Sequence, residues 1–215
     1  MNPIGRMKSW LLRFAGYLVP IVQPLPALGG WVGLMTLPFA TYLIMFFTNL
    51  PVSIIDILAA FFVPFPIFIL ERVFIIIGFL LIVYSAAHLK IKRNEGVVSS
   101  GPYRLVRHPQ YLGMIFSTLG LTSWSIWILK STFGVGFLNP SQTIGVWLIE
   151  LFAYILLALV EELFLSKKYG KIFDGYKHKV PFLIPFLKTS RKDLDVFVSI
   201  LILPIFLFVL INAPI

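Results

Sequence analysis

The chain has 215 residues, of which 59% are hydrophobic and only 13% are charged. Soluble domains carry roughly 25% charged residues, so this composition excludes an ordinary water-soluble domain and indicates membrane helices. The net charge is +9, but the basic residues cluster beside apolar runs, which favours anionic lipid headgroups over nucleic acid as their partner. The chain has no cysteine, which excludes disulfides, thiolate nucleophiles and cysteine-ligated metal sites.

Long apolar segments follow one another along the chain, and most have the length of a membrane-spanning helix, about 17–25 residues. We therefore expect an all-α, polytopic membrane helix bundle of about six to seven transmembrane helices. The first segment is short and contains Arg13 and several prolines, and we expect a retained, tilted or half-inserted helix, not a cleaved signal peptide. The segments are residues 10–25, 28–47, 51–70, 73–89, 111–129, 143–165 and 194–213.

Two loops carry most of the positive charge, residues 90–107 and 166–192. The positive-inside rule places both loops and the N-terminus in the cytoplasm, and seven crossings would then put the C-terminus outside. The chain divides on this basis into N-terminal membrane helices (1–89), a core for chemistry (90–192) and a C-terminal membrane helix (193–215). Chemistry is expected only in the two basic loops and the helix ends beside them.

The first motif, GPYRLVRHPQYLG, begins at Gly101 and ends at Gly113. Arg107 and His108 precede Pro109, which suits the first position of a helix because its missing N–H has no intrahelical partner there. The free N–H groups of such a helix start, beside Arg and His, favour an anion. The alternative is a generic basic loop followed by a proline-started helix.

The second motif, EELFLSKKYGKIFDGYKHKVPFLIP, runs from Glu161 to Pro185. Glu161 and Glu162 stand near the end of a spanning helix, where both the helix dipole and the membrane disfavour negative charge, so they need a cationic partner or ligand. The alternative is a solvated pair balanced by nearby lysines. An amphipathic interfacial helix is expected to follow, with its apolar stripe formed by Tyr169, Ile172, Phe173, Tyr176 and Val180.

A short turn over residues 130–142 joins the two motif-bearing helices, and Asn139-Pro140 resembles a helix start. The helices must then be neighbours, which brings Arg107-His108 close to Glu161-Glu162. S-adenosylmethionine suits such a site because its carboxylate matches the Arg/His side, and its ammonium matches a glutamate.

The paired motifs resemble the integral-membrane methyltransferases, a family that includes isoprenylcysteine carboxyl methyltransferases and phospholipid N-methyltransferases. The resemblance covers about residues 99–185 and implies a cofactor pocket near the cytoplasmic face, with a lipid-like or prenylated substrate entering sideways from the bilayer. It also implies Glu161 and Arg107 as catalytic residues, and Tyr169-Gly170 and Tyr176 as a closure of the pocket. The implied cofactor-binding residues are Tyr103, Arg107, His108, Pro109, Tyr111, Leu112, Gly113, Glu161, Glu162 and Tyr169.

The expected reaction is direct methyl transfer from S-adenosylmethionine, in which alignment supplies most of the catalysis. For an amine nucleophile, Glu161 could take the proton. Many relatives carry an arginine just after the Val-Pro pair, where this chain has Phe182, and the segment 90–100 is shorter than in many relatives. Both departures leave the methyl acceptor open.

Two other functions compete: an NADPH-dependent membrane reductase of the sterol-reductase kind, and a non-catalytic transporter or scaffold.

Among single residues, Glu150 lies inside an apolar segment and is a candidate to pair with Ser117 or Thr118. Asp56 is expected to be a helix-start charge. His88 and His178 are expected at the membrane interface, and three scattered histidines without cysteine predict no metal site.

Overall fold

The computed structural model describes residues 9, 13, 29–50, 53–62, 68–134, 136–187 and 194–212. Within these ranges every regular element is helical, which confirms the expected all-α class for the described part of the chain. The first apolar segment, residues 10–25, lies outside the described residues except for Arg13.

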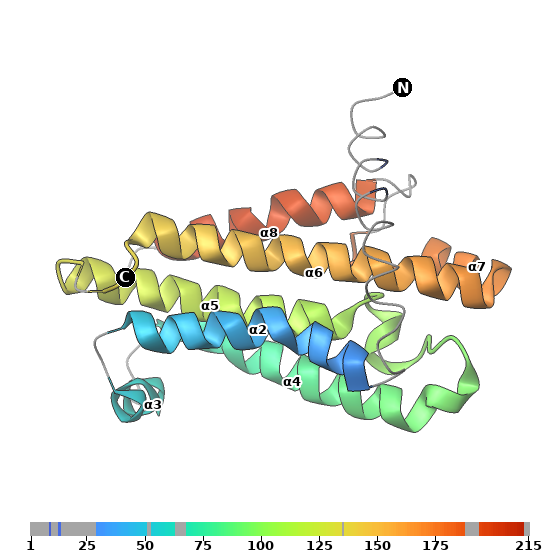
Figure 1. Cartoon of the computed structure of the whole chain (residues 1–215), viewed down its shortest axis with the longest axis horizontal. Coiled ribbons are helices and arrows are strands. Elements are labelled where there is room, and N and C mark those ends of the chain that lie inside the picture. The colour runs from blue at the N-terminus through green and yellow to red at the C-terminus, as the bar shows by residue number, and fades with distance from the viewer. Residues whose placement is uncertain are drawn as a thin grey trace.

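Five of the described helices are long and apolar enough to cross a membrane. Figure 1 shows them running roughly along the long axis of the bundle. The chain is therefore an integral membrane protein. The five helices are α2 (Gly29–Asn49), α4 (Ile69–Lys92), α5 (Pro109–Ser131), α6 (Pro140–Tyr169) and α8 (Leu194–Asn212).

The predicted single span over residues 51–70 is wrong. The structure has instead the nine-residue helix α3 (Ile54–Phe62), and α4 begins at Ile69. Nine residues rise only about 14 Å, less than half the hydrocarbon thickness. Pro64 and Pro66 stand between the two helices, and a proline inside a helix removes a hydrogen bond and clashes with the preceding turn. The described residues therefore hold five candidate spans, not six or seven.

Asp56 is a helix-start charge, as expected. It lies in the first turn of α3. Its carboxylate accepts a hydrogen bond from the Ser53 N–H at 3.1 Å, and the Ser53 hydroxyl accepts one from the Asp56 N–H at 3.1 Å.

The two basic loops meet at one end of the bundle. Pro109 and Pro140 open α5 and α6, and Asn139 and Gln142 form a reciprocal capping box at the start of α6, so the predicted helix starts are confirmed. The turn between these helices lies at the end of the bundle near α3, whereas α7 (Lys171–Lys179) lies at the opposite end (Figure 1). We call the end that carries residues 93–108 and α7 the basic end.

Small residues hold α4 and α5 close together, and this is the most extensive helix contact in the bundle. A Cβ added to Gly113 would lie 2.7 Å from the carbonyl oxygen of Gly78, and one added to Gly120 would lie 2.6 Å from that of Glu71. Such close backbone approach through small residues is typical of packed membrane helices. The close packing of α4 and α5 holds the start of α5 in place, and therefore also the first motif, which ends in the first turns of this helix.

The amphipathic helix α7 follows α6 after Gly170. Phe173, Tyr176 and Val180 are buried and form a small apolar cluster, against which Tyr169 packs. Ile172 departs from the predicted stripe, because its side chain is 71% exposed. The α7 helix therefore packs through a narrower face than the sequence pattern indicated.

Candidate active site

Arg107 and His108 are held at the basic end by the backbone on both sides. The short 3-10 helix η3 (Gly101–Arg104) precedes them, and the Arg107 N–H donates to the carbonyl oxygen of Pro181 at 3.0 Å. The His108 carbonyl accepts the first hydrogen bond of α5, from the Leu112 N–H at 3.1 Å. The start of α5 is thereby tied to the segment that follows α7.

Arg107 is a buried cation shared by two carboxylates. Its Nη1 lies 2.5 Å from Oε1 of Glu162, and its Nη2 lies 3.4 Å from Oδ2 of Asp195 at the start of α8. The guanidinium carbon also lies 5.3 Å from the centre of the Phe182 ring. Buried charges are stable only when paired in this manner, so Arg107 links α5, α6 and α8.

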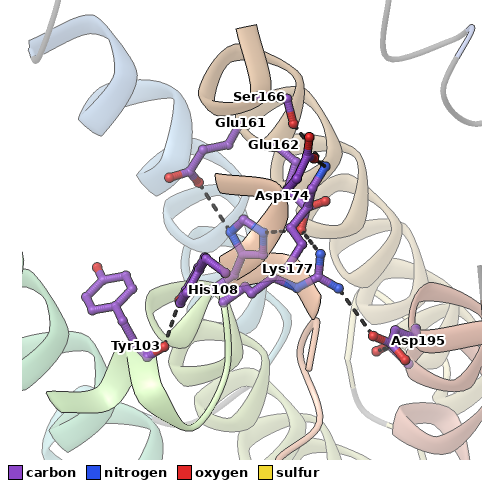
Figure 2. A network of polar contacts seen from close by, with 11 residues as sticks. Tyr103, His108, Glu161, Glu162, Ser166, Asp174, Lys177 and Asp195 are labelled. Carbon is purple, nitrogen blue, oxygen red and sulfur yellow. Dashed lines mark hydrogen bonds and ion pairs between the residues drawn. The ribbon is translucent and has the colours of Figure 1, made fainter. Parts of the chain in front are cut away.

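His108 lies between the two glutamates of α6, as Figure 2 shows. Its Nδ1 is 3.4 Å from Oε2 of Glu161 and its Nε2 is 3.3 Å from Oε1 of Glu162, while its ring stacks on Tyr111 with centroids 5.6 Å apart. Burial lowers the pKa of His108, but hydrogen bonds to Glu161 and Glu162 outweigh burial and hold this pKa above its usual value. The predicted meeting of the two motifs is confirmed.

A cavity of about 80 Å³ opens beside this charged cluster. Its aromatic side is fixed by the Tyr176 hydroxyl, which donates to the Tyr103 carbonyl oxygen at 2.7 Å. Burial raises the pKa of both phenols well above their usual value, so both hydroxyls are neutral. The cavity is lined by Leu89, Gly96, Val97, Val98, Tyr103, Arg107, His108, Glu161, Leu165, Phe173 and Tyr176.

One buried donor at the cavity, Nε of Arg107, has no hydrogen-bond partner among the described residues. The Tyr111 hydroxyl interacts with Glu161 from behind the cavity, without a hydrogen bond of normal length. Native proteins rarely leave such atoms unpaired, and pairing by a ligand is one way to satisfy them. The site therefore combines an unused donor of Arg107 with the Glu161 carboxylate, which is partly exposed at the cavity. This donor set fits the amino-acid end of S-adenosylmethionine.

The predicted site residues separate into those at the cavity and those behind it. Tyr103, Arg107, His108 and Glu161 line it, whereas Glu162 contacts Arg107 and His108 without lining it. Tyr169 belongs to the apolar cluster around Phe173, beside Gly96. The remaining predicted residues are buried in α5 and do not line the cavity: Pro109, Tyr111, Leu112 and Gly113.

Sequence reasoning missed Asp195 and Lys177. Asp195 is buried and pairs with Arg107, from 88 residues further along the chain. Lys177 donates to the Ser166 hydroxyl at 2.9 Å and lies 3.3 Å from Asp174 (Figure 2). An acidic residue in the first turn of an apolar helix was the available signal for Asp195.

The other titratable candidates lie elsewhere. His88 bonds to the Ser100 hydroxyl at 2.9 Å and stacks on Tyr103, whereas His178 is exposed on α7. Glu150 lies near Thr118, one of its two expected partners, and interacts with it. No hydrogen bond of normal length joins them, and the Thr118 hydroxyl donates to the Met114 carbonyl oxygen at 3.1 Å.

The fold and the site define a membrane helix bundle with a buried charged cluster beside a cavity at the basic end. The family model described as phospholipid methyltransferase matches residues 57–172, more than half of the chain. The chain therefore belongs to the phospholipid methyltransferase family, whose members are S-adenosylmethionine-dependent membrane methyltransferases. Comparison with curated proteins and with solved structures gave no match.

Family membership decides between the competing functions. The matched residues include Arg107, His108, Glu161 and Glu162, whereas Asp195 lies beyond the matched region. The reductase and the non-catalytic transporter or scaffold are no longer needed to account for the paired motifs.

Proposed function

We propose that this enzyme transfers the methyl group of S-adenosylmethionine to the amine headgroup of a phospholipid-type lipid, at the basic end of the bundle. The observation that carries the proposal is the pairing of Arg107-His108 with Glu161-Glu162 beside an aromatic-lined cavity. All cavity-lining residues except Leu89 fall within residues 90–192, which supports this segment as the catalytic core.

Glu161 is the carboxylate best placed for the cofactor's ammonium. Its side chain is 28% exposed and its contact with His108 is a long 3.4 Å, so a ligand can compete for it. His108 and Nε of Arg107 suit the cofactor carboxylate. When bound, the cofactor supplies an electrophilic methyl group on a sulfonium, and the rings of Tyr103 and Tyr176 favour such a cation.

Glu162 and Asp195 act through Arg107 and do not contact the cofactor themselves. Both hold Arg107, and neither lines the cavity. Their role in this proposal is to fix the guanidinium so that its remaining donor faces the ligand. They are positioning residues, whereas Arg107, His108 and Glu161 are the charged residues that touch the cofactor.

The cavity must widen to admit a cofactor. Ligand sites usually measure about 300–1,000 Å³, whereas this cavity measures about 80 Å³. The wall formed by Phe173 and Tyr176 belongs to α7, which follows a glycine with a positive φ of 51° at position 170. A small outward movement of α7 about Gly170 would enlarge the cavity without disturbing the five spans.

An amine acceptor requires removal of a proton. The headgroup nitrogen is an ammonium at neutral pH, so it must lose a proton before it can accept a methyl group. The bound cofactor would supply that methyl group and would leave as a neutral thioether. Glu161 is the exposed carboxylate at the cavity and takes this proton. The two glutamates raise the pKa of His108, which favours its charged form and makes it a less suitable base than Glu161.

Phe182 packs against Arg107 and His108 on the side away from the cavity. It is 1% exposed, packs edge-on against His108 at 5.3 Å and lies under the Arg107 guanidinium. Where many relatives present an arginine, this chain has an apolar ring that does not line the cavity. An acceptor that needs a second buried cation at that point is therefore disfavoured, which supports an amine headgroup over a carboxylate acceptor.

The orientation follows from charge. The basic end carries both lysine- and arginine-rich loops, so the positive-inside rule places it in the cytoplasm. The acceptor headgroup is then taken from the cytoplasmic leaflet, with its chains still in the bilayer.

The test uses purified full-length protein in lipid nanodiscs with tritium-labelled S-adenosylmethionine. One set contains a phosphatidylethanolamine lipid, and a second contains only a phosphatidylcholine lipid. A third set contains the phosphatidylcholine lipid together with a prenylated cysteine. We expect label in extractable lipid in the first set only. Label in the prenylated cysteine alone would contradict the amine headgroup and favour a carboxylate acceptor.

A further inference from the structure

A second cavity lies between α2 and α6, away from the basic end. It measures about 340 Å³ and is almost entirely apolar. Its rim includes Leu37 and Ile149, whose side chains are 60% and 72% exposed, so the cavity opens toward the surface that lipid covers. Its lining residues are Leu37, Pro38, Thr41, Tyr42, Met45, Val146, Ile149, Glu150 and Ala153.

The wall of this cavity contains one buried carboxyl group. Glu150 is 4% exposed, and neither of its side-chain oxygens has a hydrogen-bond partner among the described residues. It precedes Glu162 by about 18 Å along α6, at about 1.5 Å per residue, which puts it deep in the bilayer. Burying such a group without a partner costs several kcal/mol, so an ionisable residue here indicates a function.

The nearby polar groups are already engaged. The Tyr42 hydroxyl shares a hydrogen bond of 2.6 Å with the Thr122 hydroxyl, and the Tyr154 hydroxyl donates to the Met35 carbonyl oxygen at 3.2 Å. Thr118 donates within α5. Thr118 is close enough to Glu150 to interact with it, but no hydrogen bond of normal length joins them. A molecule in the cavity that carries a hydrogen-bonding group would supply the missing hydrogen bond.

We propose that the cavity between α2 and α6 binds a lipid alcohol, whose hydroxyl bonds to the Glu150 carboxyl group while its apolar body fills the cavity. A plain hydrocarbon chain leaves the carboxyl group unpaired. An ammonium lipid requires a buried ion pair in an apolar cavity, where desolvation offsets the attraction. A hydroxyl avoids both costs, since a neutral carboxyl group can donate to it and accept from it. The volume of about 340 Å³ falls within the usual range for small-molecule sites.

This site is separate from the methyl-transfer site. No residue lines both cavities. The inference therefore goes beyond the proposed function. A measurement of lipid binding at this cavity tests it independently of methyl transfer.

The test measures immobilisation of spin-labelled probes by the full-length protein in detergent micelles. The probes share one long chain and end in a hydroxyl, a methyl ether or a primary amine. We expect the wild-type protein to bind the alcohol about tenfold more tightly than the ether. Glu150→Leu should abolish this preference, and Glu150→Gln should keep most of it, because an amide also donates and accepts. Ala153→Phe should weaken all three probes by filling the cavity.

The matched control is Phe152→Leu, a neighbouring lipid-facing position of α6 that does not line the cavity. It should bind like the wild type. Thermal unfolding separates a lost site from a lost fold: Glu150→Leu should keep or raise the midpoint, because it removes an unpaired buried carboxyl group. Equal binding of alcohol and ether by the wild type, or tightest binding of the amine, would overturn the proposal.

Discussion

Arg107 and Glu162 lie 55 residues apart in the chain, yet their side chains meet at 2.5 Å in a part-buried ion pair. The contact joins the start of α5 to the last turns of α6. It leaves Glu161, the adjacent carboxylate, turned toward the cavity. Two neighbouring glutamates therefore have different surroundings, and they should respond differently to mutation.

Replacing each glutamate by alanine separates these roles. Glu161→Ala should weaken cofactor binding by about 1.5–3 kcal/mol, the size of a charge-assisted hydrogen bond, with little change in stability. Glu162→Ala should weaken cofactor binding as well, and should also destabilise the fold by about 3 kcal/mol because it removes a partner of a buried cation. Calorimetry and thermal unfolding measure the two effects. Wild-type stability in Glu162→Ala would contradict the positioning role.

Asp195 should be coupled to Arg107. A double-mutant cycle with Asp195→Asn and Arg107→Lys should give an interaction energy of about 0.5–3 kcal/mol in unfolding, since the two residues share one ion-pair network. Asp174→Asn is the matched control, because Asp174 pairs with Lys177 and not with Arg107. Additive effects for the Asp195 pair would show that the 3.4 Å contact contributes nothing.

The His108 site should weaken at alkaline pH. The folded state raises the pKa of His108 above 6.5, because its two glutamate partners outweigh burial. A raised pKa stabilises the fold fully below the unfolded value, and this contribution is lost as pH rises through the folded value. Unfolding midpoints measured from pH 6 upward, at roughly one-unit steps, should fall for the wild type and stay flatter for His108→Gln. Parallel profiles would contradict the charged imidazole.

Gly113 should matter for packing. Gly113→Ala places a methyl group against the Gly78 carbonyl oxygen, so it should destabilise the bundle by about 1–3 kcal/mol. Gly145→Ala is the matched control in α6, with no atom within 4 Å of the added carbon. It should be neutral or slightly stabilising. Equal midpoints for the two variants would contradict the close approach of α4 and α5.

The orientation can be tested because the chain has no native cysteine. Ser99→Cys in the basic loop should react from the cytoplasmic side only. Phe133→Cys, at a fully exposed position between α5 and α6, should react from the opposite side. Labelling of position 133 only from the cytoplasm would refute the hairpin.

Local chemistry made several parts of the fold predictable. Pro109 and Asn139-Pro140 mark helix starts by the same rules in any context, and both starts were confirmed. The short connection between α5 and α6 then forced the two motifs together. The segment 51–70 was mistaken for a span because hydrophobicity alone cannot tell a spanning helix from a short apolar one such as α3, which ends at Phe62, shortly before Pro64.

The sequence could not predict which of the two glutamates pairs with Arg107 and which faces the cavity. Glu161 and Glu162 are identical residues about 100° apart around a helix, and only the neighbouring helices decide which one meets Arg107. Asp195 lies far along the chain and in another apolar segment, so no spacing rule connects it to the motif. The environment of Gly113 likewise depends on α4, which the motif does not contain.

The central claim is that the methyl donor binds between Arg107-His108 and Glu161. Titration calorimetry with S-adenosylhomocysteine tests it most directly, since this ligand keeps the amino-acid end and lacks the sulfonium charge. Wild type and Glu95→Gln, an exposed carboxylate of the basic loop, should bind alike. Arg107→Ala, His108→Ala and Glu161→Ala should each bind at least about tenfold more weakly, equivalent to about 1.4 kcal/mol. Wild-type affinity in all three variants would show that the cofactor is held elsewhere.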